Sequence, residues 1–284
     1  SLIISITKAM ACAGRVSAVM DIQPDMAGGS ASAKGSSDEA VRFCNVQLTY
    51  AGAGAPSLTN VDFSVKRGQT IGVIGGTGSG KTSLVNLIPR FYDATDGKVL
   101  VDGVDVRDYP LEELRGKVGV VPQKAVLFKG TIRENLKLGK ADATEEEMRA
   151  ALASAQALEI VENKEGGLDA PVEQGGRNLS GGQRQRFTIA RALVKKPEIL
   201  ILDDSASALD YATDLKLRQA LRALPDKPTV FIVSQRTSSI RHADQIVVLD
   251  DGKVCGIGTH EELLETCKVY QEIYYSQYDK KEAK

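Results

Sequence analysis

The sequence has no tryptophan, only two histidines and only four cysteines in 284 residues. The cysteines are scattered and form no C-x-x-C pair, so neither a disulfide framework nor a zinc site is expected. This cysteine usage fits a reducing cytosol. The two histidines, His242 and His260, are too few for a histidine metal site.

A strong charge of either sign is also missing, since the formal net charge is -1. This balance counts against a nucleic-acid partner, because phosphate backbones select basic surfaces. Long apolar runs are absent too: the N-terminal apolar residues are soon interrupted by Lys8. We therefore expect no segment that spans a bilayer, and the N-terminus lacks the pattern of a signal peptide.

Composition divides the chain into three parts. Residues 1–22 carry apolar residues near helical spacing, which predicts one helix. Residues 23–37 are small, polar and rich in glycine and serine, so we expect a flexible linker. The compact domain is expected over residues 38–284.

Within that domain, strand and helix patterns alternate. Strands are expected at 41–50, 70–74, 98–101, 104–106, 118–121, 199–202, 229–233, 245–249 and 253–255. Helices are expected at 81–88 and about 213–224 and at the C-terminus, with mostly helical patterns over 131–194. Apolar strands that alternate with helices imply an α/β fold with a parallel sheet covered on both faces. The helical stretch, at about 124–195, suggests an inserted subdomain.

A glycine-rich segment, Gly75-Gly-Thr-Gly-Ser-Gly-Lys-Thr82, matches G-x-x-x-x-G-K-[ST] between an expected strand and an expected helix. Glycines let the backbone wrap tightly, so that N–H groups point at phosphate oxygens. Lys81 should reach the β- and γ-phosphates of ATP, and the Thr82 hydroxyl should bind Mg²⁺. The expected nucleotide-binding residues here are Gly75, Gly76, Thr77, Gly78, Ser79, Gly80, Lys81, Thr82 and Ser83.

Asp203 follows the apolar strand Ile199–Leu202. A buried parallel strand that ends in a carboxylate places a charge at the sheet edge beside the phosphate loop. Asp203 should therefore hold Mg²⁺ together with Thr82. Buried strands often end in aspartate, so this pattern gains its weight from the loop upstream.

Leu179-Ser-Gly-Gly-Gln183 lies between these two motifs and resembles the signature of the ATP-binding cassette proteins. Ser180, Gly181, Gly182 and Gln183 would cap a helix whose positive end faces a γ-phosphate. In the family that phosphate is bound by the other cassette of a dimer. The resemblance runs from about residue 38 to residue 275. It implies a P-loop NTPase fold: a parallel-sheet core, an antiparallel β subdomain and an inserted α-helical subdomain.

Smaller motifs agree with this resemblance. Tyr50 resembles the family's adenine-stacking aromatic residue, with a strand-end core residue as the alternative. Gln123 resembles the glutamine that joins the Mg²⁺ shell and senses the transmembrane partner. Ser207–Asp210 resembles the loop that crosses to the partner cassette. Glu173 sits where exporters carry a loop that touches the membrane domain, and residues 128–136 also resemble exporters.

Two positions depart from the family pattern. The residue after the Mg²⁺ aspartate is usually the catalytic glutamate, but here it is Asp204. An aspartate carboxylate falls short by roughly 1.5 Å, and a misplacement of about 1 Å can cost about a hundredfold in rate. The expected switch histidine is replaced by Gln235, which can donate a hydrogen bond but carries no charge. His242 lies too far along the chain to substitute, and His260 looks like a structural helix-start residue.

These changes are either neutral drift, with hydrolysis retained, or the mark of a degenerate catalytic site. We favour the second interpretation, in which Asp204, Gln235 and Gln123 form a slow site and the intact signature completes the site of a different partner subunit. The resemblance implies an ATPase subunit of an exporter, weak or inactive alone, on the cytoplasmic face of a cell membrane. Its partners would be a second cassette and a transmembrane domain. A soluble cassette ATPase and an import ATPase are the alternatives.

Overall fold

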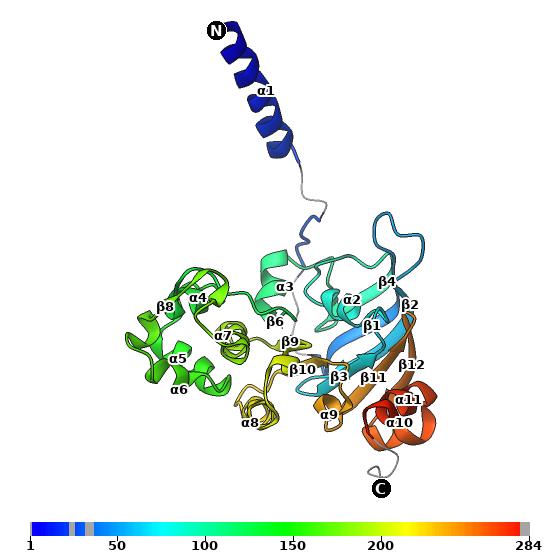
Figure 1. The fold of residues 1–284 in the computed structure, drawn as a ribbon. Coiled ribbons are helices and arrows are strands. Elements are labelled where there is room, and N and C mark those ends of the chain that lie inside the picture. The colour runs from blue at the N-terminus through cyan, green and yellow to red at the C-terminus, as the bar shows by residue number, and fades with distance from the viewer. Residues whose placement is uncertain (1, 23–25, 32–36, 279–284) are drawn as a thin grey trace.

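A six-stranded sheet lies at the centre of the computed structural model, which describes residues 2–22, 26–31 and 37–278 (Figure 1). Its strand order is β12-β11-β3-β10-β9-β6. All neighbours are parallel except β12, which pairs antiparallel with β11. The strands are β3 (Thr70–Gly75), β6 (Val118–Val121), β9 (Ile199–Asp203), β10 (Thr229–Val233), β11 (Gln245–Asp250) and β12 (Lys253–Gly258).

Both faces of this sheet are buried. Along β10, Val230 and Ile232 point into one apolar cluster, whereas Phe231 and Val233 point into the other. Successive side chains of a strand alternate between faces, so a strand covered on both sides must be apolar throughout. This explains why β3, β9 and β10 read as continuous apolar runs and confirms the predicted α/β class.

A second, antiparallel sheet with the order β2-β1-β4-β5 covers one face. Its strands are β1 (Glu39–Leu48), β2 (Leu58–Lys66), β4 (Asp96–Val101) and β5 (Val104–Asp105); a short pair, β7 (Gly130–Thr131) and β8 (Pro171–Val172), lies elsewhere. Strand β2 was not predicted from the sequence. Its alternation of apolar residues is broken at Asn60, which adopts a positive φ of 48° where the pairing with β1 is irregular.

The other face is covered by most of the helices, whereas the two that follow β3 and β5 pack on the same side as the antiparallel sheet. The helices after α1 are α2 (Lys81–Asn86), α3 (Leu111–Lys117), α4 (Ile132–Lys137), α5 (Glu145–Ser154), α6 (Leu158–Glu162), α7 (Gly181–Leu193), α8 (Tyr211–Arg222), α9 (Thr237–Ile240), α10 (His260–Thr266) and α11 (Lys268–Gln277). Between β6 and β9, α4 to α7 gather at one end of the molecule, as the predicted helical insertion requires (Figure 1). The short helix α3 was not predicted.

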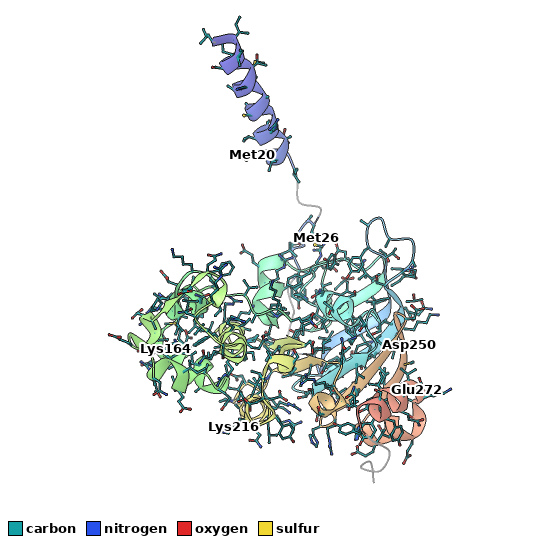
Figure 2. All side chains as sticks on the ribbon, in the orientation of Figure 1. Met20, Met26, Lys164, Lys216, Asp250 and Glu272 are labelled. Atoms are coloured by element: carbon teal, nitrogen blue, oxygen red, sulfur yellow. The ribbon has the colours of Figure 1, made fainter. Side chains whose placement is uncertain are left out.

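Helix α1 (Leu2–Met20) projects away from the body of the protein, and none of its described side chains is buried (Figures 1 and 2). Its 19 residues have a mean hydropathy of 1.5, so α1 meets the length and composition of a membrane-spanning helix. This corrects the expectation that the chain holds no such segment. Lys8 and Arg15 interrupt the apolar residues, so no long uninterrupted run occurs, but the mean hydropathy over the whole helix stays high.

Part of the expected flexible linker is tied to the domain surface. Residues 23–25 and 32–36 lie outside the described residues, whereas Met26–Ala31, here called the strap, form backbone contacts. The Gly29 and Ala31 N–H groups donate to the carbonyls of Tyr109 (2.9 Å) and Asp108 (2.8 Å). The Arg90 guanidinium donates to the Ala27 carbonyl at 2.9 Å. The strap therefore links the α1 side of the chain to the segment that leads into α3.

Candidate functional site

The glycine-rich loop leaves the carboxyl end of β3 and enters α2 at Lys81. Gly78 and Gly80 adopt φ angles of 79° and 95°, which residues with a Cβ rarely adopt. The Lys81 ammonium lies back against this loop and donates to the carbonyls of Gly75 (2.9 Å) and Gly76 (2.7 Å). The loop thus places the Lys81 ammonium beside a tightly wrapped backbone, as a phosphate-binding loop requires.

An acidic pair lies beside this loop, at the carboxyl end of β9. The Thr82 hydroxyl is 3.2 and 3.1 Å from the two carboxylate oxygens of Asp203. The next residue, Asp204, accepts a hydrogen bond from Gln123 Nε2 at 3.2 Å. Because β3, β9, β10 and β6 are parallel neighbours, residues that follow these strands converge at one sheet edge.

Asp204 also has an unusual backbone, with φ of 44° in the left-handed region. That conformation costs a non-glycine residue roughly 1–2 kcal/mol. It is held by three hydrogen bonds: the Asp204 N–H donates to the Val233 carbonyl at 2.9 Å, and the Ser207 hydroxyl (2.7 Å) and N–H (3.2 Å) donate to the Asp204 carbonyl.

The charges of this edge are partly desolvated. Burial lowers the pKa of the Lys81 ammonium, and the carboxylates of Asp203 and Asp204 oppose that effect. Burial raises the pKa of Asp203, and the like charge of Asp204 adds to the rise, while the Thr82 hydrogen bond opposes it. A cation bound beside Asp203 and an anion bound beside Lys81 would each stabilise a charge that burial disfavours.

The donors at this edge fit Mg²⁺, which prefers oxygen ligands and binds through one or two carboxylates together with substrate phosphates. Asp203 and Thr82 offer such oxygens. Among the described residues no group of three or more His, Cys, Asp or Glu side chains could hold a metal ion. A magnesium ion here would therefore need phosphate oxygens to complete its shell.

Four separate segments close around one cavity at this edge. It is lined by Thr77, Gly78, Lys81, Thr82, Gln123, Asp203, Asp204, Val233, Ser234 and Gln235. The structure thus brings together the predicted loop, the predicted magnesium ligands and the three predicted catalytic residues. Val233 and Ser234 were not predicted, because an apolar residue and a serine at a strand end carry no distinctive sequence signal.

Tyr50 lies next to the helix that follows the loop. Its hydroxyl donates to Ser83 Oγ at 2.8 Å, and its ring meets Tyr92 edge-on at 4.8 Å between centroids. The sequence analysis did not single out Tyr92. The contact joins Tyr50 to the first turn of α2, across 33 residues of sequence.

The signature residues start α7 and lie apart from the Lys81 cavity. Ser180 Oγ accepts the Gln183 N–H at 3.2 Å, and Gln183 Oε1 accepts the Ser180 N–H at 3.1 Å, a reciprocal capping box. Gly181 lines a different cavity, between Gln123, Gln174 and α7. Within this chain the signature therefore does not meet the phosphate loop.

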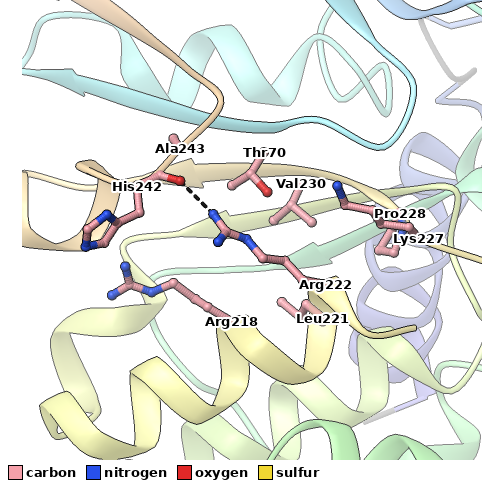
Figure 3. Close-up of a pocket in the computed structure, with 9 residues that line it drawn as sticks. All are labelled: Thr70, Arg218, Leu221, Arg222, Lys227, Pro228, Val230, His242 and Ala243. Atoms are coloured by element: carbon pink, nitrogen blue, oxygen red, sulfur yellow. Dashed lines mark hydrogen bonds between the residues drawn. The ribbon is translucent and has the colours of Figure 1, made fainter. Parts of the chain in front are cut away.

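The positions of His242 and His260 agree with the sequence predictions. Figure 3 shows His242 in a cavity with Arg218, Arg222 and Thr70, and its carbonyl accepts from Arg222 at 2.6 Å. Thr70 begins β3, so this cavity lies at the opposite edge of the sheet from the phosphate loop. His260 is buried at the start of α10, with Nδ1 2.7 Å from the Tyr270 hydroxyl. Neither histidine reaches the Lys81 cavity.

Comparison with known families identifies the chain. The family model described as ABC transporter matches residues 58–207, more than half of the sequence, including the phosphate loop, the signature and Asp203. The chain belongs to the ABC transporter family. It is an ATP-binding domain of that family's ATPases, with the parallel core, antiparallel sheet and helical insertion of their fold.

Similar proteins are ABC exporters and their relatives. An uncharacterised ABC transporter ATP-binding protein of Mycobacterium tuberculosis is 44% identical over 276 residues, 95% of this chain and 47% of the relative. An ATP-dependent lipid A-core flippase of Vibrio vulnificus is 40% identical over 272 residues, 95% of this chain and 46% of the flippase. The solved structure of a bacterial Atm1-family ABC exporter with ATP bound is 33% identical, with a TM-score of 0.89, over 97% of this chain and 48% of that one. This cassette thus spans about half the length of the relatives it matches.

Proposed function

We propose that this cassette binds MgATP in the Lys81 cavity and, as part of a longer protein, drives export across a membrane from its cytoplasmic face. The observation that carries the proposal is the convergence of Lys81, Thr82, Asp203 and Gln123 on one cavity. The names of the relatives, among them a lipid flippase and a putative multidrug exporter of Bacillus subtilis, support export as the coupled work.

Each binding residue has a definable task. The loop amides and Lys81 hold the β- and γ-phosphates, which requires Lys81 Nζ to exchange the carbonyls of Gly75 and Gly76 for phosphate oxygens. Thr82 Oγ1 and Asp203 supply oxygen ligands to Mg²⁺, which when bound neutralises charge on the phosphates. Tyr50 stacks on the adenine ring.

The residues on the catalytic side of the cavity should support only slow hydrolysis. Asp204 holds its carboxylate one methylene further from the nucleotide than a glutamate would, and Gln123 Nε2 ties that carboxylate down. Gln235 can donate a hydrogen bond to the γ-phosphate without adding charge. The site formed by these residues should therefore bind ATP firmly and hydrolyse it slowly.

A second, different cassette completes the catalytic unit. Ser180–Gln183 caps α7 at the surface, apart from the phosphate loop of its own chain. The first amides of α7 and its positive end suit the γ-phosphate on a partner's loop. A partner with a glutamate and a histidine at the altered positions would then hydrolyse ATP with the help of this signature.

A transmembrane domain is the other proposed partner. The cavity between Gln123, Gln174 and α7 suits a short helix of that domain, because it is bordered by the loop that holds Glu173. Gln185 Nε2, buried on the wall of this cavity, has no hydrogen-bond partner among the described residues. Helix α1, exposed and apolar, and the strap provide the covalent route from such a domain to the cassette.

The degenerate-site proposal is tested by restoring the family residues. In the chain paired with a partner whose catalytic glutamate is replaced by glutamine, turnover comes from this chain's own site. We expect Asp204→Glu with Gln235→His to raise ATP turnover by about 10- to 100-fold, because both groups then reach the nucleotide. The Kd for MgATP should change less than threefold.

The matched control is Asp62→Glu, which lengthens an aspartate of β2 by the same methylene; its carboxylate pairs with Arg42, outside the cavity. It should leave turnover unaltered. No gain from the double substitution, with nucleotide still bound, would show that Asp204 and Gln235 do not limit hydrolysis.

A further inference from the structure

The turn between β10 and α9 carries Ser234 and Gln235 to the nucleotide cavity, and it is held from outside by the last residue of α11. Gln277 Nε2 donates to the Gln235 carbonyl at 2.6 Å. Gln277 Oε1 accepts from the Thr237 N–H at 2.9 Å and from the Thr237 hydroxyl at 3.0 Å. One side chain thus clamps the two ends of the segment Gln235–Thr237 from 40 residues away.

The orientation of the Gln277 amide follows from its partners. The Thr237 N–H can only donate and the Gln235 carbonyl can only accept, so Oε1 must face Thr237 and Nε2 must face Gln235. Thr237 is fully buried, and its N–H is one of the first-turn donors of α9 that the helix cannot satisfy. The Arg236 side chain does not cap this helix. Without Gln277, a buried backbone donor would lose its partner.

The inner end of the turn is fixed independently. The Ser234 N–H donates to the Val73 carbonyl at 3.1 Å, and Ser234 Oγ accepts the Arg236 N–H at 3.0 Å. The first contact anchors the turn to β3 and the second lies within the turn, whereas Gln277 anchors the turn to the C-terminal helix. Gln235 lies between the two anchors and lines the nucleotide cavity. The position of its amide therefore depends on both.

We infer that Gln277 is a positioning residue for nucleotide turnover: it fixes the backbone of Gln235–Thr237 and so sets where the Gln235 amide stands against the γ-phosphate. This inference rests on the proposed function, because it takes the cavity as the ATP site. Gln277 touches none of the residues that line that cavity except through the Gln235 carbonyl. Its removal should therefore affect turnover and leave ATP binding intact.

The test compares three variants of the full chain, each paired with the same partner whose catalytic glutamate is replaced by glutamine. Gln277→Ala removes both halves of the clamp, and Gln277→Glu retains an acceptor for Thr237 but loses the donor to Gln235. Gln271→Ala is the control, since Gln271 lies on the same helix and donates to Leu264 at 2.8 Å, away from the turn. Single-turnover hydrolysis at several ATP concentrations separates kcat from half-saturation, and hydrogen exchange follows the Thr237 amide.

For Gln277→Ala we expect faster exchange at Thr237, a fall in kcat of about tenfold and half-saturation within twofold of the original chain. For Gln277→Glu we expect Thr237 to stay protected while kcat still falls. Gln271→Ala should match the original chain in all three measurements.

Two results would overturn the inference: a kcat for Gln277→Ala equal to that of the control, or equal losses of kcat and ATP affinity, which would mark general destabilisation. Failure of the proposed function looks different. In that case the original chain itself would bind no MgATP, whatever stands at position 277.

Discussion

Two segments of this chain are proposed to face phosphate, the loop Gly75–Thr82 and the signature Ser180–Gln183, and they differ in what surrounds them. The loop Gly75–Thr82 opens into a cavity that also holds Asp203, Gln123 and Gln235. The signature Ser180–Gln183 caps α7, and none of its four residues lines that cavity. Under the proposed function, the loop supplies most of the contacts to the nucleotide, whereas the signature acts on a nucleotide held by another chain. The proposal therefore makes nucleotide binding a property of one cassette and efficient hydrolysis a property of two.

The largest expected effect is a loss of MgATP binding after a substitution in the phosphate loop. Lys81→Ala should weaken MgATP binding to the isolated chain by about 100-fold, because charge-assisted contacts to the phosphates are lost. Ser180→Ala should leave binding to the isolated chain within twofold. Titration with a fluorescent ATP analogue measures both variants. A comparable loss in Ser180→Ala would contradict the division between the two segments.

An intermediate effect is expected at Asp203, whose pKa is raised by burial. The folded-state pKa lies above the unfolded value, so the ionised carboxylate destabilises the ATP-free fold at neutral pH. That cost disappears as the pH falls through the raised pKa. Asp203→Asn should therefore raise the Tm of the ATP-free chain slightly at pH 7, while it weakens Mg²⁺-dependent ATP binding on the order of tenfold.

The pH dependence sharpens this prediction. MgATP affinity of the original chain should decline as the pH falls toward the raised pKa, because protons then compete with Mg²⁺ for Asp203. The Asp203→Asn variant should lack this decline. Thermal unfolding and ATP titrations between pH 4 and pH 8 provide the check. A Tm for Asp203→Asn below that of the original chain at pH 7 would reverse the sign argued here.

The smallest effect concerns Tyr50. Tyr50→Ala should weaken ATP binding about fivefold, since base stacking contributes on the order of 1 kcal/mol. Tyr50→Phe retains the ring and loses only the hydrogen bond to Ser83, so its affinity should stay within twofold. Within each variant, GTP and ATP should bind with equal affinity if the ring acts by stacking on the base. Equal losses in the Phe and Ala variants would instead assign the contribution to the hydroxyl.

Features with a local signal were predictable from the chain alone. Glycines that allow positive φ marked the phosphate loop, and the alternating apolar strands marked the parallel core. Strand β2 escaped because a single irregular residue, Asn60, interrupts its period. Helix α1 was predicted as a helix, but its match to a membrane-spanning helix was not, since two cations interrupt its apolar residues while its mean hydropathy stays high. The strap was expected to be flexible because of its small, polar composition. Its contacts with the domain could not be predicted locally, since they join residues more than 60 positions apart.

The sequence by itself determined the family resemblance, the candidate nucleotide-binding residues and the two departures at Asp204 and Gln235, because each depends on residue types at short spacing. Only the tertiary structure decided that Gln123 holds Asp204, that Tyr50 meets Ser83 and that Gln277 clamps the turn of Gln235. Those contacts cross 81, 33 and 42 residues. Such pairings depend on how the strands and helices pack, and no local pattern encodes that packing.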